Sequence, residues 1–320
     1  MWRKVQEVLI PSSRGYGMSY FLAVDAGGSK TEFLLANEDR ELQRVVSGSV
    51  KRLNASETEA ALQLDDALNR LAQLTGISMN QISRTCIGTS GNTVPLVVDW
   101  LQENFSRRVS GSLLILGDVE IALDAAFPGE RGVLVLAGTG SNVAGRGRDG
   151  KIITAGGWGP MLADQCAGFW IGLEGLRRGF LAMDEDRPSK LLEKARELWG
   201  LPTVASLIEF ANSEPRPLFS EFAPLVVDCA DLGDEVACEI LDRGAADLTY
   251  LAELVIDRVL RSEHSQLPPP AIATAGSILG KVRRIRETVV SRLQNRYATL
   301  QFVEPADPVR GALYRARIGS

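Results

Sequence analysis

One arrangement of strands and turns occurs twice in this chain and limits its fold more than any other feature. YFLAVDAGGSKTEFLLANEDRELQRVVSG, from Tyr20, is typical of strand, glycine-rich turn, strand, short loop and strand. RGVLVLAGTGSNVAGRGRDGKIITAGG, from Arg131, follows the same order and includes an Asp-Gly hairpin. The repeat predicts two domains of related α/β architecture, and 320 residues suit two such domains.

The remaining segments alternate between helical spacing and short buried strands. RTCIGTSG, SLLILGD, AIATAGSIL and LQFVEP are predicted strands, and LQFVEP is the last of them. Residues 161–253 are predicted to be mostly helical, and Pro308 is placed in the first turn of the final helix. Further helices are predicted at 57–74, 94–105, 121–126 and 281–295, with Asp124 as an ordinary polar residue of the third.

Composition excludes several classes of protein. The formal net charge is −5, and Lys and Arg form only short clusters such as 281–286, which disfavours a nucleic-acid-binding surface. No apolar run reaches the ~18–20 residues of a membrane span. Residues 1–17 lack the apolar core of a secretory signal and are interpreted as an extension or a misplaced start.

Cysteine and histidine usage narrows the chemistry. The four cysteines form no C-x-x-C pair, which predicts a reduced, cytoplasmic chain without disulfides or structural zinc. The single histidine, His264, precedes a triple proline and is typical of a solvated loop. A Ser-His-Asp triad is therefore disfavoured, and acid–base chemistry is expected from carboxylates.

The first glycine-rich turn, DAGGSKT, has the features of a phosphate-binding loop. Gly27 and Gly28 leave backbone N–H groups open to an anion, and Ser29 and Lys30 are potential donors to phosphate. Asp25 would repel a phosphate unless a divalent cation lay between them, which points to Mg²⁺. The alternative is an ordinary hairpin that contains glycines.

The second turn, AGTGSN, adds hydroxyl groups to the same arrangement. Gly138 and Gly140 permit close approach of a ligand, and Thr139 and Ser141 can donate to it. Two such turns, one in each predicted domain, suggest that both hold one phosphate chain.

Asp118 follows the buried strand SLLILGD, at the edge where open α/β sheets place their ligands. A carboxylate there is a candidate general base for a hydroxyl group. The alternative is that Asp118 caps the following helix.

Two further segments have ligand-binding character. GGWGPMLADQ offers an aromatic face in Trp158 and polar groups in Asp164 and Gln165, the residue types that bind a sugar. A core Trp with a helix-capping Asp is the alternative reading of those residues. Gly276, in TAGSIL, follows a strand and leaves room for a flat purine, or it is a plain strand-to-helix turn.

The order of these motifs resembles the N-acetylglucosamine kinase branch of the BadF/BadG/BcrA/BcrD ATPase family, within the sugar kinase/Hsp70/actin superfamily. The resemblance extends from about Tyr20 to Arg317 and is most specific over 138–164. It implies two ribonuclease-H-like domains around a central nucleotide and sugar cleft. The expected limits are 18–118 with the final helix 307–320 for the first domain and 119–306 for the second.

The resemblance also implies the roles of individual residues. Asp118 would be the base that accepts the proton of the sugar 6-hydroxyl, and Asp25 would face Mg²⁺. The ATP side would comprise Gly27, Gly28, Ser29, Lys30, Gly138, Thr139, Gly140 and Gly276. The sugar side would comprise Asn54, Ser141, Asn142, Gly157, Trp158, Gly159, Asp164 and Gln165. A homodimer is expected by the same resemblance.

Departures from the family pattern leave the sugar open. Asp164-Gln165 stands where N-acetylglucosamine kinases have Asp-Glu and resembles bacterial glucosamine kinases, whereas Trp158 favours the N-acetylated sugar. Cys166-Ala167 replaces a usual Gly-Ser, and Cys229 lies near a segment expected to line the nucleotide. The alternatives in other classes are an ATPase activator of a 2-hydroxyacyl-CoA dehydratase and a sugar-sensing regulator.

Overall fold

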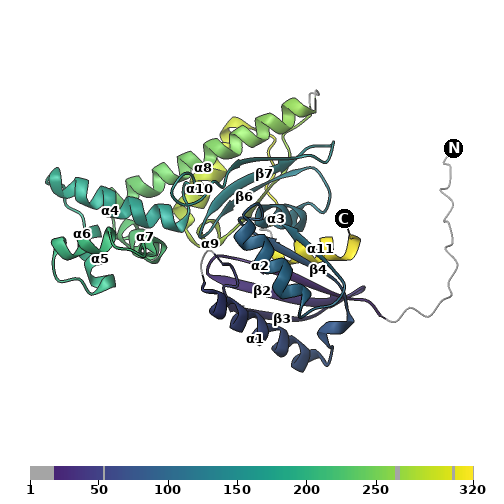
Figure 1. The fold of residues 1–320 in the computed structure, drawn as a ribbon. Helices are drawn as coiled ribbons and strands as arrows, with labels where there is room; N and C mark the ends of the chain where they lie inside the picture. The colour runs from purple at the N-terminus through teal and green to yellow at the C-terminus, as the bar shows by residue number, and fades with distance from the viewer. Residues whose placement is uncertain (1–17, 53–54, 264–266, 305–306, 320) are drawn as a thin grey trace.

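The structure, a computed structural model, describes residues 18–52, 55–263, 267–304 and 307–319 and contains two mixed β-sheets (Figure 1). The first contains β1 (Tyr20–Ala26), β2 (Lys30–Asn37), β3 (Glu41–Gly48), β4 (Ile82–Thr89) and β5 (Ser112–Leu116). The second contains β6 (Gly132–Ala137), β7 (Ser141–Arg146), β8 (Ile152–Gly156) and β9 (Ile272–Ala275). Their strand orders are β3-β2-β1-β4-β5 and β8-β7-β6-β9.

The predicted repeat is present as a repeat of topology. In each sheet a three-stranded antiparallel meander comes first, β1–β2–β3 or β6–β7–β8. A later strand, β4 or β9, then joins parallel to the first strand of the meander. The carboxyl ends of the parallel strands and the glycine-rich turns therefore lie at the same edge of each sheet.

Helices cover both faces of the first sheet, which explains why β1 is continuously apolar. Leu22 and Val24 pack with α1 (Glu57–Thr75) and α2 (Pro95–Ser106) on one face. Phe21 and Ala23 pack with α11 (Pro308–Ile318) on the other. A capping box between Ser56 and Glu59 fixes the start of α1.

α3 (Asp118–Ala126) lies between the two sheets and contributes to both cores. Ile121 packs with the first-sheet cluster that includes α11, whereas Ala122 and Leu123 pack against the second sheet. α11 crosses α3 in direct contact, because a Cβ on Gly311 would stand 1.7 Å from the carbonyl oxygen of Ile121. The final helix thus returns to the first sheet, as predicted.

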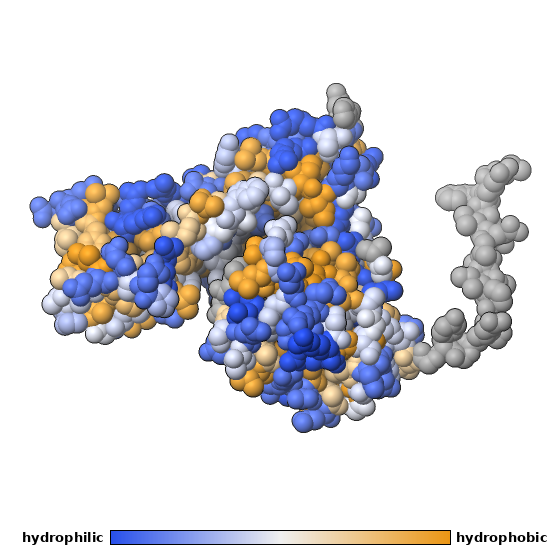
Figure 2. All heavy atoms as spheres, in the orientation of Figure 1, coloured by the Kyte–Doolittle hydropathy of each residue, from blue (hydrophilic) through white to orange (hydrophobic). Residues whose placement is uncertain are grey.

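The second sheet is extended by helices that project away from it. α8 packs on the second sheet. The rest of the long helical segment, α4–α7, forms a lobe (Figure 1). Figure 2 shows that the molecule is hollowed between this lobe and the body that holds the first sheet. The helices are α4 (Gly168–Asp184), α5 (Leu191–Trp199), α6 (Val204–Ala211), α7 (Ala223–Asp231) and α8 (Glu235–Ser262), followed by α9 (Ser277–Lys281) and α10 (Arg283–Arg296).

Four sequence predictions need correction. LQFVEP is not a strand over its described residues: it contributes one parallel bridge, between Ile272 and Phe302. The helix predicted over 281–295 is preceded by the short α9, and the helix predicted from Ile121 already begins at Asp118. Asp124 is not a surface residue, because it is fully buried and paired with Arg146.

The limits of the two domains, 18–118 with 307–320 and 119–306, stay a prediction. Residues 1–17, Asn54 and His264 lie outside the described residues. Within the part that the structure describes, no helix combines the length and apolar character needed to cross a bilayer.

Candidate active site

The first glycine-rich turn joins β1 to β2. Gly27, Gly28 and Ser29 form the turn, and Lys30 begins β2. Lys30 is exposed and forms an ion pair with Glu32, so in this structure its ammonium lies along the strand. The turn is too tight for larger residues, because a Cβ on Gly27 would stand 2.8 Å from the carbonyl oxygen of Lys30.

The second turn joins β6 to β7 and lies against the start of α4. The Gly138 amide donates to the Gly140 carbonyl over 2.8 Å, which closes the turn. The Gly168 amide, in the first turn of α4, donates to the Gly138 carbonyl over 2.8 Å. The positive end of the α4 dipole therefore lies beside this turn, which favours a negatively charged ligand.

The structure brings the two turns together. The side-chain oxygens of Ser29 and Thr139 lie 3.3 Å apart, and both residues are exposed at the end of their sheets. Two sets of backbone N–H groups and two hydroxyls can therefore reach one anionic ligand. This pairing favours phosphate loops over two unrelated hairpins.

Gly276 completes this edge of the second sheet. Its φ is +94°, and a Cβ there would stand 2.3 Å from the carbonyl oxygen of Ala137 and 3.0 Å from the Gly138 amide. Only glycine fits this position without strain. Gly276 precedes α9 and so holds the β9–α9 connection against the second turn.

Asp118 and Asp25 are the acidic groups of the first sheet's ligand edge. Gly117 is the N-cap of α3 and Asp118 is its first residue, with its carboxylate accepting from the Val119 amide over 2.8 Å. Burial raises the pKa of Asp118, and the Val119 hydrogen bond opposes this. Burial, followed by the charge of Asp118, raises the pKa of Asp25 to about 7. The two carboxylates thus interact.

This acidic pair fits a Mg²⁺ site. Mg²⁺ is commonly bound by one or two carboxylates together with substrate phosphates and water. The described residues contain no cluster of three or more His, Cys, Asp or Glu side chains that could hold a metal by themselves. A cation held by Asp25 would relieve the repulsion that raises its pKa.

The predicted sugar residues after the second turn converge on one another. The Ser141 hydroxyl donates to the Gln165 carbonyl over 2.7 Å, which ties β7 to the loop before α4. Asn142 Oδ1 and Gln165 Oε1 are buried and have no partner among the described residues. Two buried acceptors without donors are costly, so they indicate a ligand that brings N–H or O–H groups.

Asp164 belongs to the same cluster and is buried. Its Oδ2 would lie 2.9 Å from a Cβ on Gly140, so the second turn and the sugar loop are in close contact. Burial raises the pKa of Asp164 to about 6, although hydrogen bonds from the Gly159 and Ser141 amides oppose the rise. Asp164 does not cap α4, whose N-cap is Ala167.

The GGWG loop is less enclosed. A Cβ on Gly157 would stand 2.4 Å from Nδ2 of Asn142, which places this glycine against the sugar cluster. The backbone amide of Gly159 donates a hydrogen bond to the Asp164 carboxylate. Trp158 is 75% exposed, so it is not a core residue, and its contact with a sugar stays a prediction.

One residue of this region was not anticipated from the sequence. Lys51, in the loop after β3, is only 9% exposed and donates a hydrogen bond from Nζ to the Ser90 hydroxyl at the end of β4. Asp118 and Asp164 both interact with its charge. Nothing in the sequence distinguishes Lys51 from its neighbour Arg52, because only the fold brings this loop to the ends of β4 and β5.

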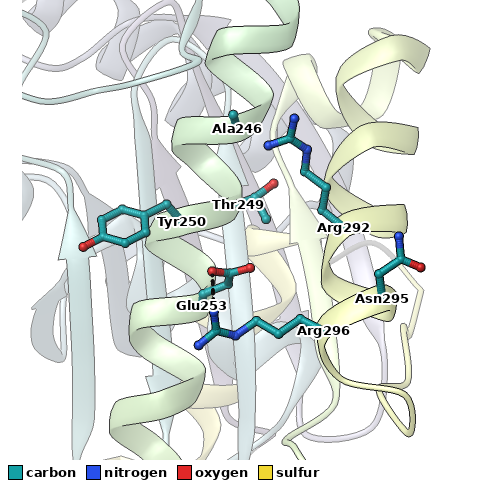
Figure 3. Close-up of a pocket in the computed structure, with 7 residues that line it drawn as sticks. All are labelled: Ala246, Thr249, Tyr250, Glu253, Arg292, Asn295 and Arg296. Carbon is teal, nitrogen blue, oxygen red and sulfur yellow. Dashed lines mark hydrogen bonds and ion pairs between the residues drawn. The ribbon is translucent and has the colours of Figure 1, made fainter.

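A separate hollow of about 580 Å³ lies between α8 and α10 (Figure 3). It is lined by Thr249, Tyr250, Arg292 and the ion pair between Glu253 and Arg296. None of the residues predicted from the sequence to bind substrate or nucleotide lines it. The chemistry-bearing residues gather instead at the edges of the two sheets, which form the candidate active site.

Comparisons with known proteins agree with this fold. A solved candidate N-acetylglucosamine kinase from Chromobacterium violaceum superposes with a TM-score of 0.71 at 24% identity, covering 92% of this chain and 98% of that one. A ROK family glucokinase from Streptomyces griseus superposes with a TM-score of 0.56 at 15% identity, covering 94% of this chain and 98% of that one. The two-sheet α/β architecture is therefore that of the actin-like ATPase fold.

The family follows from the sequence comparisons. Residues 22–316 match the model of the BadF/BadG/BcrA/BcrD ATPase family, and the chain belongs to that family. An N-acetylmuramic acid/N-acetylglucosamine kinase of Clostridium acetobutylicum is 25% identical over 94% of this chain and 99% of its own length. An N-acetyl-D-glucosamine kinase of Dictyostelium discoideum is 26% identical over 91% of this chain and 96% of its own length. The family recognised from the motifs is thus confirmed.

Proposed function

We propose that this protein is an ATP-dependent sugar kinase that phosphorylates the 6-hydroxyl of an amino sugar. N-acetylglucosamine is the leading candidate for that sugar. The observation that carries the proposal is the meeting of two glycine-rich turns, 3.3 Å apart at Ser29 and Thr139, at the ligand edges of two sheets. The family match supports it, as do the relatives described above, which are named as sugar kinases.

The nucleotide is assigned to the two turns. Backbone N–H groups of Gly27, Gly28 and Gly140, with the Ser29 and Thr139 hydroxyls, would hold the phosphates. Gly138, whose own amide is bonded to the Gly140 carbonyl, would line the loop beside them, and Gly276 would lie beside the adenosine. Lys30 would reach a phosphate after leaving Glu32. Asp25 would hold Mg²⁺, which supplies positive charge to neutralise the phosphates when bound. The turns and the start of α4 would stabilise charge on the transferred phosphoryl group.

We assign the acceptor sugar to the polar cluster described above, which contains Asn142, Asp164 and Gln165. Asp118 would accept the proton of the 6-hydroxyl, a role that contributes typically ~10²–10⁴-fold in rate. Asp164, with the unpartnered acceptors of Asn142 and Gln165, would receive hydroxyl groups of the sugar. Ser141, Gly157, Trp158 and Gly159 would complete its surroundings, as would Asn54, which lies outside the described residues.

Glucosamine is the second candidate. Gln165 presents a buried neutral acceptor, which suits an ammonium or a hydroxyl group equally. An ATPase activator that shares an iron–sulfur cluster between subunits is disfavoured by the cysteines. All four are free, but Cys86, Cys166 and Cys229 are buried, and they lie in two separate cores.

A panel assay tests the proposal. ADP release is coupled to an absorbance readout with N-acetylglucosamine, N-acetylmuramic acid, glucosamine and glucose as acceptors, and the product is identified by ³¹P NMR. We expect acceptor-dependent ADP release, greatest with N-acetylglucosamine, and a 6-phosphate ester. ADP release that no sugar stimulates would refute the kinase. The cytoplasmic location and the homodimer stay predictions, and light scattering of the purified protein tests the dimer.

A further inference from the structure

Lys51 is a buried cation whose environment no structural role accounts for. Lysine is almost never fully buried unless it is paired. Here Lys51 as a residue is 9% exposed. Its ammonium donates a hydrogen bond to one hydroxyl, that of Ser90, and forms no ion pair with the described residues. An ammonium has three N–H donors. Its remaining donors are therefore available to a ligand.

The hydrogen bond to Ser90 places the Lys51 ammonium at the end of β4, the strand that pairs with β5 just before Asp118. Burial lowers the pKa of Lys51, and Asp118 and Asp164 are the two groups whose charges raise it. Asp118 starts α3 beside the first sheet, whereas Asp164 belongs to the loop before α4 on the second sheet. Lys51 thus interacts with carboxylates from both sides of the proposed acceptor site.

Four side-chain groups of the proposed acceptor site act as acceptors: two are carboxylates, and two are buried amide oxygens without a partner among the described residues. Asp118, Asp164, Asn142 Oδ1 and Gln165 Oε1 can all receive a hydroxyl proton. A sugar hydroxyl bound through its proton still has lone pairs that require a donor. Lys51 is the cation that can supply one beside Asp118.

We propose that Lys51 is a further catalytic residue, which donates a hydrogen bond to the acceptor oxygen of the sugar as Asp118 takes its proton. This inference rests on the proposed function. The hydroxyl proton moves to Asp118, the oxygen forms a bond to the γ-phosphorus, and the bond from that phosphorus to the β–γ bridging oxygen breaks. ADP leaves with the electron pair, and Lys51 keeps its proton throughout.

The physical basis is the charge that develops on the acceptor oxygen. A cation fixed before the reaction in a site shielded from water stabilises that charge without having to reorganise. Ser90 and the burial of the side chain hold the ammonium in place before substrate arrives. Loss of one such donor typically costs ~10²–10³-fold in kcat.

Lys51→Met tests the proposal, with Arg52→Met as the matched control. Both variants remove one positive charge from the same loop. The Arg52 guanidinium donates a 2.7 Å hydrogen bond to the carbonyl of Ala55, in the same stretch of chain. We expect Lys51→Met to retain the wild-type melting temperature and ATP affinity and to lose ~10²–10³-fold in kcat. Arg52→Met should stay within about threefold of wild type.

Chemical rescue provides a second variant and separates catalysis from structure. Lys51→Ala leaves a space for a small amine, so methylammonium or ethylammonium should restore its kcat in a saturable way. Equal losses in Lys51→Met and Arg52→Met, an unchanged kcat in Lys51→Met, or absence of rescue in folded Lys51→Ala would each overturn the role of Lys51. A wild-type protein inactive on every sugar would instead refute the proposed function.

Discussion

The hydroxyl groups of Ser29 and Thr139 lie 3.3 Å apart although 110 residues separate them in the chain. Ser29 belongs to the β1–β2 turn and Thr139 to the β6–β7 turn, so the contact joins the two halves of a topological repeat. Each turn alone is compatible with an ordinary hairpin. Their contact makes them a single surface of N–H and O–H donors, which is what a chain of phosphates requires.

Removing either hydroxyl should weaken the use of ATP. We expect Ser29→Ala and Thr139→Ala each to lower kcat/KM for ATP by ~10–100-fold, because a hydrogen bond to a charged group contributes ~1.5–3 kcal/mol. The KM for the sugar should change little. Steady-state kinetics with varied ATP at saturating sugar measures this. Ser213→Ala, which removes a hydroxyl bonded to the Phe210 carbonyl on the surface, is the control and should match wild type.

Gly276 should not tolerate a side chain. Gly276→Ala combines a φ of +94° with a Cβ only 2.3 Å from the Ala137 carbonyl oxygen, so the second turn must move. We expect a lower melting temperature and a raised KM for ATP. Gly280→Ala, four residues on, meets nothing within 4 Å and should leave both unchanged. Equal behaviour of the two variants would contradict the tight contact described at Gly276.

Sugar binding should depend on the ionisation of Asp164. Its pKa is raised to about 6 by burial, so the carboxylate is ionised above that pH and protonated below it. The acceptor form is lost as the pH falls, and we expect the KM for the sugar to rise below about pH 6 at saturating ATP. Asp164→Asn should raise this KM at all pH values and remove its pH dependence. A parallel pH dependence in wild type and variant would assign the ionisation to another group.

The buried ion pair between Asp124 and Arg146 should contribute strongly to stability. Nη2 of Arg146 lies 2.7 Å from Oδ1 of Asp124, and the pair joins α3 to β7 of the second sheet. Asp124→Ala leaves a buried arginine without its partner, and we expect a loss of ~3–5 kcal/mol in the free energy of unfolding. Asp242→Ala breaks an exposed pair with Arg284 and should cost less than ~1 kcal/mol. Urea unfolding of both variants measures the difference.

The sequence was sufficient where the signal is local. Glycine-rich turns after apolar strands predicted the repeat, and the position of Asp118 after an apolar strand predicted its place at the ligand edge. That strand, β5, was expected to be buried, but its residues are only partly buried or exposed. The family was predicted from the order of the motifs, and the resemblance to it implied the fold class and the return of the final helix to the first sheet; all three are confirmed. The roles of the site residues stay predictions.

The remaining features depend on tertiary contacts that no local pattern encodes. Asp124 resembles a surface residue until α3 is placed between two sheets, where Arg146 of β7 meets it. Lys51 resembles any loop lysine until its loop meets the ends of β4 and β5. LQFVEP has the composition of a strand but pairs with β9 through one bridge only.

Above all, we propose that the γ-phosphoryl group of ATP is transferred to an amino sugar with Asp118 as the base. The most direct test compares wild type with Asp118→Asn in acceptor-dependent ADP release, with ATP affinity measured on the same preparations. We predict that N-acetylglucosamine strongly stimulates ADP release by the wild type. In Asp118→Asn the stimulated rate should fall ~10²–10⁴-fold while ATP still binds. Stimulated release that persists at the wild-type rate in Asp118→Asn would contradict the account.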